Sequence, residues 1–171
     1  QKPGSKLPAG VTPANSYVFD VFRVAGGKTH TYCFHGTVED DFQWNVADAK
    51  PVAEDDASEV GQYLGPFKSL PDKRFAGTAP DILEATWRQT RDPKLFGNER
   101  AHRGPNYSDD RPRRFTRLHL LDAKGARAMR GSLNCKNFKY DFANLFVQKV
   151  AEKESQETAF VALIEPYVGE P

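Results

Sequence analysis

The residue types best suited to hold a metal ion stand on two neighbouring strand-like segments. Asp20 lies within residues 16–24, and Cys33 and His35 lie within residues 29–36. Aspartate and histidine are ordinary zinc ligands, and a cysteine thiolate is another. A carboxylate among apolar strand residues is also costly to bury without a partner or a metal. These residues predict a candidate zinc site, although two ligands do not close such a site, which takes three or four.

A Gly-Gly step between the two segments predicts a β-hairpin that would bring these ligands together. With Gly26 and Gly27 as the turn, Asp20 pairs with Cys33, and His35 is a diagonal neighbour of Asp20. Because side chains alternate along a strand, all three then share one face, with diagonal neighbours roughly 7–8 Å apart. The inference depends on the turn, since one extra loop residue would reverse the face. The alternative is that Asp20 accepts hydrogen bonds from a neighbour or faces solvent.

The other face of the second segment carries His30, Tyr32 and Phe34. A histidine and a tyrosine two positions apart on a strand can act as base and acid, so His30 and Tyr32 are predicted substrate-binding candidates. The alternative, and the commoner role of such residues, is that both are satisfied polar tips at a sandwich edge. His102 and His119 are interpreted as structural, and no catalytic residue is identified.

The tryptophans, the cysteines and the absence of common catalytic motifs narrow the classes of function that the sequence supports. Trp44 and Trp87 could stack on sugar rings, although core packing is the commoner role of a tryptophan. Cys33 and Cys135 are too few for a disulfide scaffold, so a single bridge and buried free thiols both stay open. The P-loop, G-x-G-x-x-G, G-x-S-x-G, H-E-x-x-H and paired C-x-x-C motifs do not occur. Nucleotide-binding, acyl-transfer and zinc-finger functions therefore have no support.

Composition and charge fit one folded domain. The 171 residues are 39% apolar and 12% aromatic, which argues against disorder. A net charge of +1 argues against nucleic-acid binding, and no apolar run is long enough to span a membrane. The charge is uneven, because residues 38–60 carry eight acids against one base, whereas residues 88–114 carry eight bases against four acids. These are two solvated loops of opposite sign, or else the basic segment meets an anionic partner such as an acidic polysaccharide.

Short strands separated by turns must position these residues. Beyond the first two segments, strand-like runs occupy residues 63–67, 81–88, 115–121, 126–130, 144–150 and 158–165. The last two runs flank a polar turn and predict a second hairpin, and the only helix candidate, near residues 48–60, contains Pro51. The pattern predicts an all-β fold, an antiparallel β-sandwich of supersandwich type with one long basic loop. Residues 1–15 are predicted to be irregular and residues 16–171 to form the sandwich.

Two stretches of the chain resemble a known family. SYVFDVFRVAGGKTHTYCFHG (residues 16–36) is similar to a strand pair in the C-terminal β-sandwich domain of heparinase II/III-like polysaccharide lyases. FVALIEPYVGEP (residues 160–171) is similar to a strand near the far end of that domain, and ATWR (residues 85–88) and RLHLLD (residues 117–122) also suit it. Members of the family join an α/α toroid to the sandwich and cleave uronic-acid polysaccharides by β-elimination in the cleft between them.

This resemblance implies specific roles. The family's sandwich can hold zinc through His, Asp and His, and Asp20 and His35 match the Asp and the second His. No histidine precedes His30, so the first His ligand has no counterpart. Tyr32 would face the cleft, as a tyrosine of this region does in some members. The toroid also has no counterpart, so we expect a domain excised from a larger chain and inactive alone.

The expected role is to complete the substrate cleft of an exported bacterial lyase, periplasmic or secreted. The expected partners are an anionic polysaccharide and the α/α toroid of the parent chain. Two other functions fit the sequence. An independent carbohydrate-binding module would expose aromatic side chains, and a structural interaction domain would expose a large apolar patch.

Overall fold

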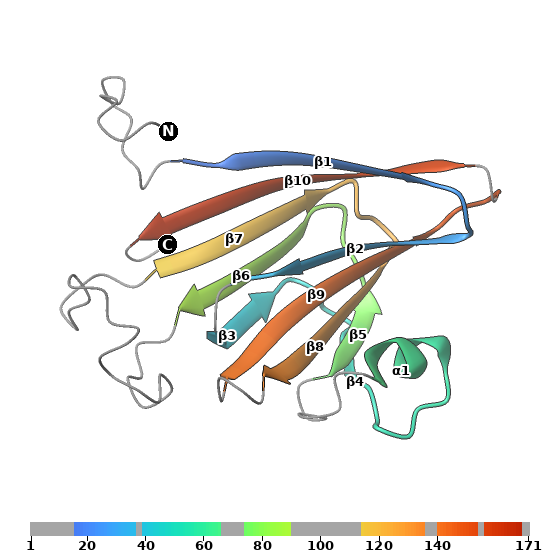
Figure 1. Ribbon diagram of the computed structural model, residues 1–171, viewed down its shortest axis with the longest axis horizontal. Coiled ribbons are helices and arrows are strands. Elements are labelled where there is room, and N and C mark those ends of the chain that lie inside the picture. Colours follow the sequence, from blue (N-terminus) through green and yellow to red (C-terminus); the bar gives the residue numbers. More distant parts are fainter. Residues whose placement is uncertain are drawn as a thin grey trace.

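Ten strands and one short helix occur in the computed structural model, which describes residues 16–36, 39–65, 74–89, 114–135, 140–153 and 156–168 (Figure 1). The strands of the first sheet, sheet A, are β1 (Val18–Ala25), β3 (Glu39–Trp44), β6 (Leu83–Gln89), β7 (Arg114–Leu121) and β10 (Glu157–Val168). The strands of sheet B are β2 (Thr29–His35), β4 (Lys50–Pro51), β5 (Phe75–Thr78), β8 (Arg127–Cys135) and β9 (Tyr140–Val150), and the helix is α1 (Glu59–Leu64). Residues 1–15 and most of the basic segment lie outside the described residues.

The two sheets are antiparallel throughout and pack face to face. Sheet A has the strand order β1-β10-β7-β6-β3, and sheet B has the order β2-β9-β8-β5-β4. Side chains on each strand alternate between an inner face, which meets the other sheet, and an outer face. The predicted all-β antiparallel sandwich is therefore confirmed.

Trp87 on β6 joins the two sheets at the centre of the core. Its side chain is fully buried, and its indole N–H donates a 2.8 Å hydrogen bond to the carbonyl oxygen of Ala143 on β9. The rings of Phe34 and Phe42 meet it edge-on, with centroids at 5.1 and 4.9 Å. A Cβ on Gly36 would lie 2.5 Å from the Trp87 ring, so only glycine fits where the chain passes this side chain. Trp87 is thus a core residue rather than a sugar platform.

The two predicted hairpins are wrong, because each of these connections passes from one sheet to the other. β1 pairs with β10 in sheet A, whereas β2 pairs with β9 in sheet B. β9 and β10 likewise lie in different sheets, and so do β7 and β8 (Figure 1). Gly26 and Gly27, with φ of 84° and 77°, supply the left-handed backbone that this tight crossing needs.

The acidic region is also more ordered than its sequence predicts. Residues 39–44 and 50–51 form β3 and β4, where the sequence indicated a loop and part of a helix. The helix begins only at Glu59, after Ser58, whose hydroxyl accepts the N–H of Gly61 as an N-cap. Of the strand predicted at residues 63–67, residues 63 and 64 are helical instead, and residues 66 and 67 lie outside the description.

Helix α1 covers only sheet B. Its buried Val60 and Leu64 pack against Met129 and Phe146 on the outer face of that sheet. Within the described ranges no helix lies over the outer face of sheet A, and none is long and apolar enough to cross a membrane. Among the described residues, the outer face of sheet A is therefore open.

Asp48 fastens the end of the acidic region to sheet B. Its Oδ1 accepts the N–H of Thr78 at 2.8 Å, and a Cβ on neighbouring Gly77 would lie 2.6 Å from the same oxygen. The hydrogen bond from Thr78 lowers the pKa of the Asp48 carboxyl. The folded state therefore favours the ionised carboxylate.

Replacing Trp87 by phenylalanine is expected to lower the free energy of unfolding by about 1–3 kcal/mol, because the Ala143 carbonyl loses its buried donor. Urea unfolding followed by far-UV circular dichroism, rather than by tryptophan fluorescence, measures this loss. Trp44→Phe is the matched control, since Trp44 is only half-buried at the margin of the core. Equal losses in the two variants would contradict the special role of the inter-sheet hydrogen bond.

Asp48→Asn is expected to flatten the acid dependence of stability. Because the folded pKa lies below the unfolded value, the stabilisation from Asp48 is present above the unfolded pKa and is lost as pH falls through the folded pKa. Asparagine keeps the acceptor oxygen without the proton equilibrium. Urea midpoints compared at about pH 5 and about pH 3 should fall less in the variant than in the wild type. An identical fall would show that Asp48 does not contribute.

Candidate functional site

Asp20 lies on the inner face of β1, at the margin of the core. It is half-buried, pairs with Ala162 of β10, and accepts a 3.1 Å hydrogen bond from the hydroxyl of Tyr32. The carboxylate therefore has a protein partner across the gap between the sheets. This is the alternative in which Asp20 accepts a hydrogen bond from a neighbour.

His35 and Cys33 lie on the outer face of sheet B, away from Asp20. The His35 ring is exposed, sits edge-on to Phe142 at 6.2 Å and has Nδ1 2.8 Å from the Gly36 carbonyl oxygen. Cys33 is a free, exposed thiol whose sulfur is 3.7 Å from the Tyr63 hydroxyl. Burial and this thiol raise the pKa of Tyr63 to about 12.

The predicted zinc ligands therefore do not converge. Asp20 points between the sheets and His35 points outward from sheet B, because the hairpin register that placed them together does not form. Among the described residues, no three His, Cys, Asp or Glu side chains are grouped closely enough to hold a metal ion. As placed, Asp20 and His35 do not fit a shared zinc site.

His30 and Tyr32 share the inner face of β2 and are 2% and 5% exposed. His30 Nε2 lies 2.9 Å from the Gly26 carbonyl oxygen, which can only accept, so Nε2 carries the proton and fastens the crossing turn. Burial, with Asp20 second, raises the pKa of Tyr32 far above its ordinary value. Tyr32 therefore stays protonated at neutral pH and donates to Asp20, and the substrate-binding role of both residues stays a prediction.

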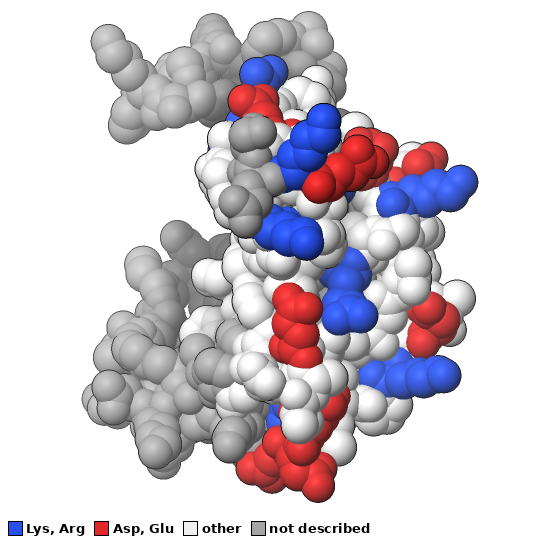
Figure 2. Space-filling view, turned by 90° about the vertical axis from the view of Figure 1, so that its right-hand side faces the viewer, with Lys and Arg blue, Asp and Glu red and all other residues white. Residues whose placement is uncertain are grey.

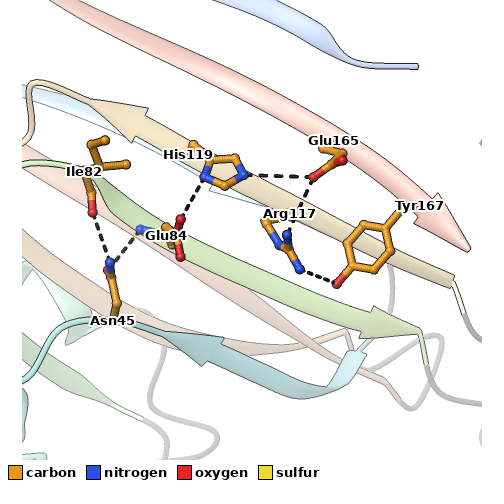
Figure 3. Close-up of polar contacts among 7 residues, drawn as sticks. All are labelled: Asn45, Ile82, Glu84, Arg117, His119, Glu165 and Tyr167. Carbon is orange, nitrogen blue, oxygen red and sulfur yellow. Dashed lines mark hydrogen bonds and ion pairs between the residues drawn. The ribbon is translucent and has the colours of Figure 1, made fainter. Parts of the chain in front are cut away.

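The outer face of sheet A instead holds a connected polar network (Figure 3). His119 of β7 lies between two carboxylates, with Nδ1 3.1 Å from Glu84 of β6 and Nε2 4.0 Å from Glu165 of β10. The same Glu165 oxygen is 3.8 Å from Arg117 Nη1, and Arg117 Nη2 donates to the Tyr167 hydroxyl at 3.1 Å. Five titratable side chains from three adjacent strands thus meet on one partly exposed surface.

Strand register explains why these side chains meet. Across the sheet, Leu163, His119 and Glu84 form one row, and Glu165 and Arg117 belong to the next. Residues two apart on a strand share a face, so both rows point outward. Asn45 fixes the end of the first row, because its side chain accepts the Glu84 N–H at 2.9 Å and donates to the Ile82 carbonyl at 3.0 Å.

An aromatic pair continues this surface toward the end of the sheet. The rings of Phe115 and Tyr167 stack with an interplanar angle of 4° and a centroid distance of 4.8 Å. The Arg117 guanidinium lies 4.8 Å from the centroid of the Tyr167 ring. We call Phe115, Arg117 and Tyr167 the aromatic–arginine cluster. It combines flat apolar surface with a cation, which is the composition that suits a sugar ring bearing a carboxylate.

The opposite end of the sandwich has a different character. A groove of about 830 Å³ lies between the turns at residues 122–126 and 150–156, and its charged lining residues are Glu59, Asp122, Lys124, Arg127, Lys149 and Glu152. Figure 2, which faces the right-hand side of Figure 1, shows basic and acidic side chains interspersed there. Such mixed charge provides no concentrated field for a polyanion.

Sequence reasoning missed this network. His119 and Arg117 alternate within FTRLHLL, and Glu165 and Tyr167 alternate near the C-terminus, so each strand shows its own outward face. Nothing in the sequence shows that these two strands are neighbours. The predicted hairpin paired residues 158–165 with residues 144–150 instead. The alternation within each strand therefore identifies the outward-facing residues, but finding the network also requires the strand order, which the sequence does not show.

No protein-family model matches the sequence. No curated protein matches it either. The function is therefore argued from the chain itself.

Proposed function

We propose that this chain is a β-sandwich domain that binds a uronic-acid polysaccharide on the outer face of sheet A, as the non-catalytic part of a heparinase II/III-like lyase. The observation that carries the proposal is the aromatic–arginine cluster, which lies where the basic segment leaves and rejoins the sheet. In the parent protein this surface would complete the substrate cleft. The resemblance of residues 16–36 and 160–171 to the sandwich of that family supports the same assignment.

The basic segment is tethered at this cluster. β6 ends at Gln89 and β7 begins at Arg114, next to Phe115. In the register of sheet A, Arg88, Phe115 and Tyr167 form a single row across three strands. Residues 88–114 hold eight bases and four acids, a composition that would attract a polyanion.

The chemistry of the network fits a sugar acid. Arg117 is about one-third exposed, and its ion pair with Glu165 is loose at 3.8 Å, so a substrate carboxylate can compete for its donors. Glu84, Glu165 and His119 offer acceptors and a donor for hydroxyl groups. The exposed margin of the Tyr167 and Phe115 rings offers an apolar surface for the sugar face.

The proposed role in the parent reaction is charge neutralisation. In β-elimination a base removes the proton beside the uronate carboxylate, and the glycosidic oxygen leaves. A cation on that carboxylate stabilises the negative charge that develops during proton removal. The domain would supply this cation and hold the sugar, while the base would come from the toroid side of the cleft.

A structural interaction domain is the second candidate, and one observation favours it. The side chains of Tyr17, which precedes β1, and of Phe19 and Val21 on β1 are 68%, 60% and 46% exposed. Contiguous exposed apolar surface of this kind usually marks a contact with another protein surface.

Arg117→Ala is expected to weaken binding of an oligogalacturonate about tenfold or more, because a charge-assisted hydrogen bond to the carboxylate is lost. Isothermal titration calorimetry on the 171-residue chain measures the affinity. Tyr167→Ala should weaken binding as well, through loss of the ring. Added salt should reduce the wild-type affinity, since the contact is partly exposed.

Arg127→Ala is the matched control, because Arg127 is an exposed arginine on sheet B at the other end of the sandwich. A neutral oligosaccharide of the same length separates carboxylate recognition from ring stacking. The proposal fails if the wild-type chain binds neither sugar, or if Arg127→Ala weakens binding as much as Arg117→Ala.

A further inference from the structure

Strand β1 is a regular edge of sheet A, and its two charged side chains, Asp20 and Arg23, are held by Tyr32 and Glu157 of the same chain. It pairs with β10 on one side, and in the described part of the chain no strand pairs with its other side. Every second peptide group along that side therefore points away from the sheet with its N–H and C=O open to pairing. Its eight residues VFDVFRVA contain no proline and no lysine, and its register with β10 runs without a bulge.

Two of the other three edges of the described sandwich, β3 and β4, are protected by devices that β1 lacks, whereas β2 has no proline, lysine or bulge either. β3, the opposite edge of sheet A, contains Glu39, Asp40 and Asp41 and a register shift within this acidic stretch. β4, an edge of sheet B, is only two residues long and ends in Pro51. Charges, bulges, short strands and proline all discourage edge-to-edge pairing. Compared with β3 and β4, β1 is open to a partner strand, and its large exposed apolar side chains distinguish it from β2.

The open edge is also apolar on both of its faces. Phe19 and Val21 are exposed on the outer face, Phe22 is 43% exposed on the inner face, and Tyr17 precedes the strand. An aromatic side chain can bury about 150–250 Å² of surface. The exposed parts of Tyr17, Phe19 and Phe22 therefore offer on the order of 300 Å² of surface per copy for burial in an interface. Two copies with their paired backbones approach the roughly 1,000 Å² that a specific interface needs.

We propose that β1 pairs antiparallel with β1 of a second copy of this chain, which joins two sheets A into one continuous ten-stranded sheet. A twofold axis perpendicular to the sheet keeps the outer faces of both copies on the same side. The side chain of a given residue then points to the same face of the joined sheet in both copies. Residues opposite each other in an antiparallel pair also share a face, so the axis passes between one residue and the same residue of the second copy.

Charge selects which residue lies on the axis. An axis at Asp20 would set two carboxylates directly opposite each other, which is destabilising. An axis at Phe22 would run the pairing into the Gly26 turn. An axis at Val21 pairs the strand from Tyr17 to Ala25, places Arg23 opposite Phe19 of the second copy and opposes no like charges. Arginine against an aromatic face is a favourable cross-strand pair, so the Val21-centred register is the self-complementary one of these three.

Sedimentation velocity on the 171-residue chain tests this pairing. We expect the wild type to sediment as a dimer of twice 19.2 kDa and Val21→Lys to sediment as a monomer, because two lysines meet on the axis. Val150→Lys is the matched control, since Val150 is 70% exposed at the end of β9, and it should remain dimeric. A monomeric wild type at about 100 μM, well above the ~1 μM dissociation constant of a weak specific complex, would overturn the proposal.

A charge-swap experiment tests the register itself. Val21→Glu should also be monomeric, and an equimolar mixture of Val21→Lys and Val21→Glu should form a heterodimer, because residue 21 faces only its own symmetry mate. Folding of each variant is verified by circular dichroism. A Val21→Lys variant that stays dimeric, or a mixture that stays monomeric, would overturn the Val21-centred pairing. Sugar binding through the aromatic–arginine cluster is measured separately and does not depend on either result.

Discussion

The buried indole N–H of Trp87 must find an acceptor, and it finds one only on the opposite sheet. A buried donor without a partner costs about 1–3 kcal/mol, so the bond to Ala143 fixes the position of β6 over β9. Phe34 and Phe42 close around the ring, and Gly36 is the residue that lets β2 leave the sandwich past it. The spacing and relative placement of the two sheets depend on this contact.

Sheet-crossing connections give the sandwich its two exposed surfaces. Because β1 and β2, β7 and β8, and β9 and β10 each divide between the sheets, β10 lies between β1 and β7 in sheet A. The outward rows of β6, β7 and β10 then bring together Glu84, His119, Arg117 and Glu165, while β1 is left at the edge. One topology therefore produces both the polar face proposed to bind sugar and the apolar edge proposed to pair.

Strand positions could be predicted from the sequence, but strand partners could not. The β-branched and aromatic composition of residues 16–24, and the alternation of Arg117 and His119 with leucines in residues 115–121, are local properties that identify β1 and β7. Pairing is a property of the whole fold, and a Gly-Gly turn fits a hairpin and a sheet crossing equally well. The predicted convergence of Asp20 and His35 failed for this reason, and the network around His119 was missed for the same reason. Acidic residues hid β3, whose inner face is set by Phe42 and Trp44.

The central proposal is that a uronic-acid polymer binds at the aromatic–arginine cluster on the outer face of sheet A. Titration of the ¹⁵N-labelled chain with an oligogalacturonate, followed by backbone and arginine side-chain NMR, tests this most directly. The account predicts chemical-shift changes at Phe115, Arg117, Glu165 and Tyr167 and none on β2 or α1. Changes confined to the Asp20 and Tyr32 region, or to the groove at the opposite end, would contradict it.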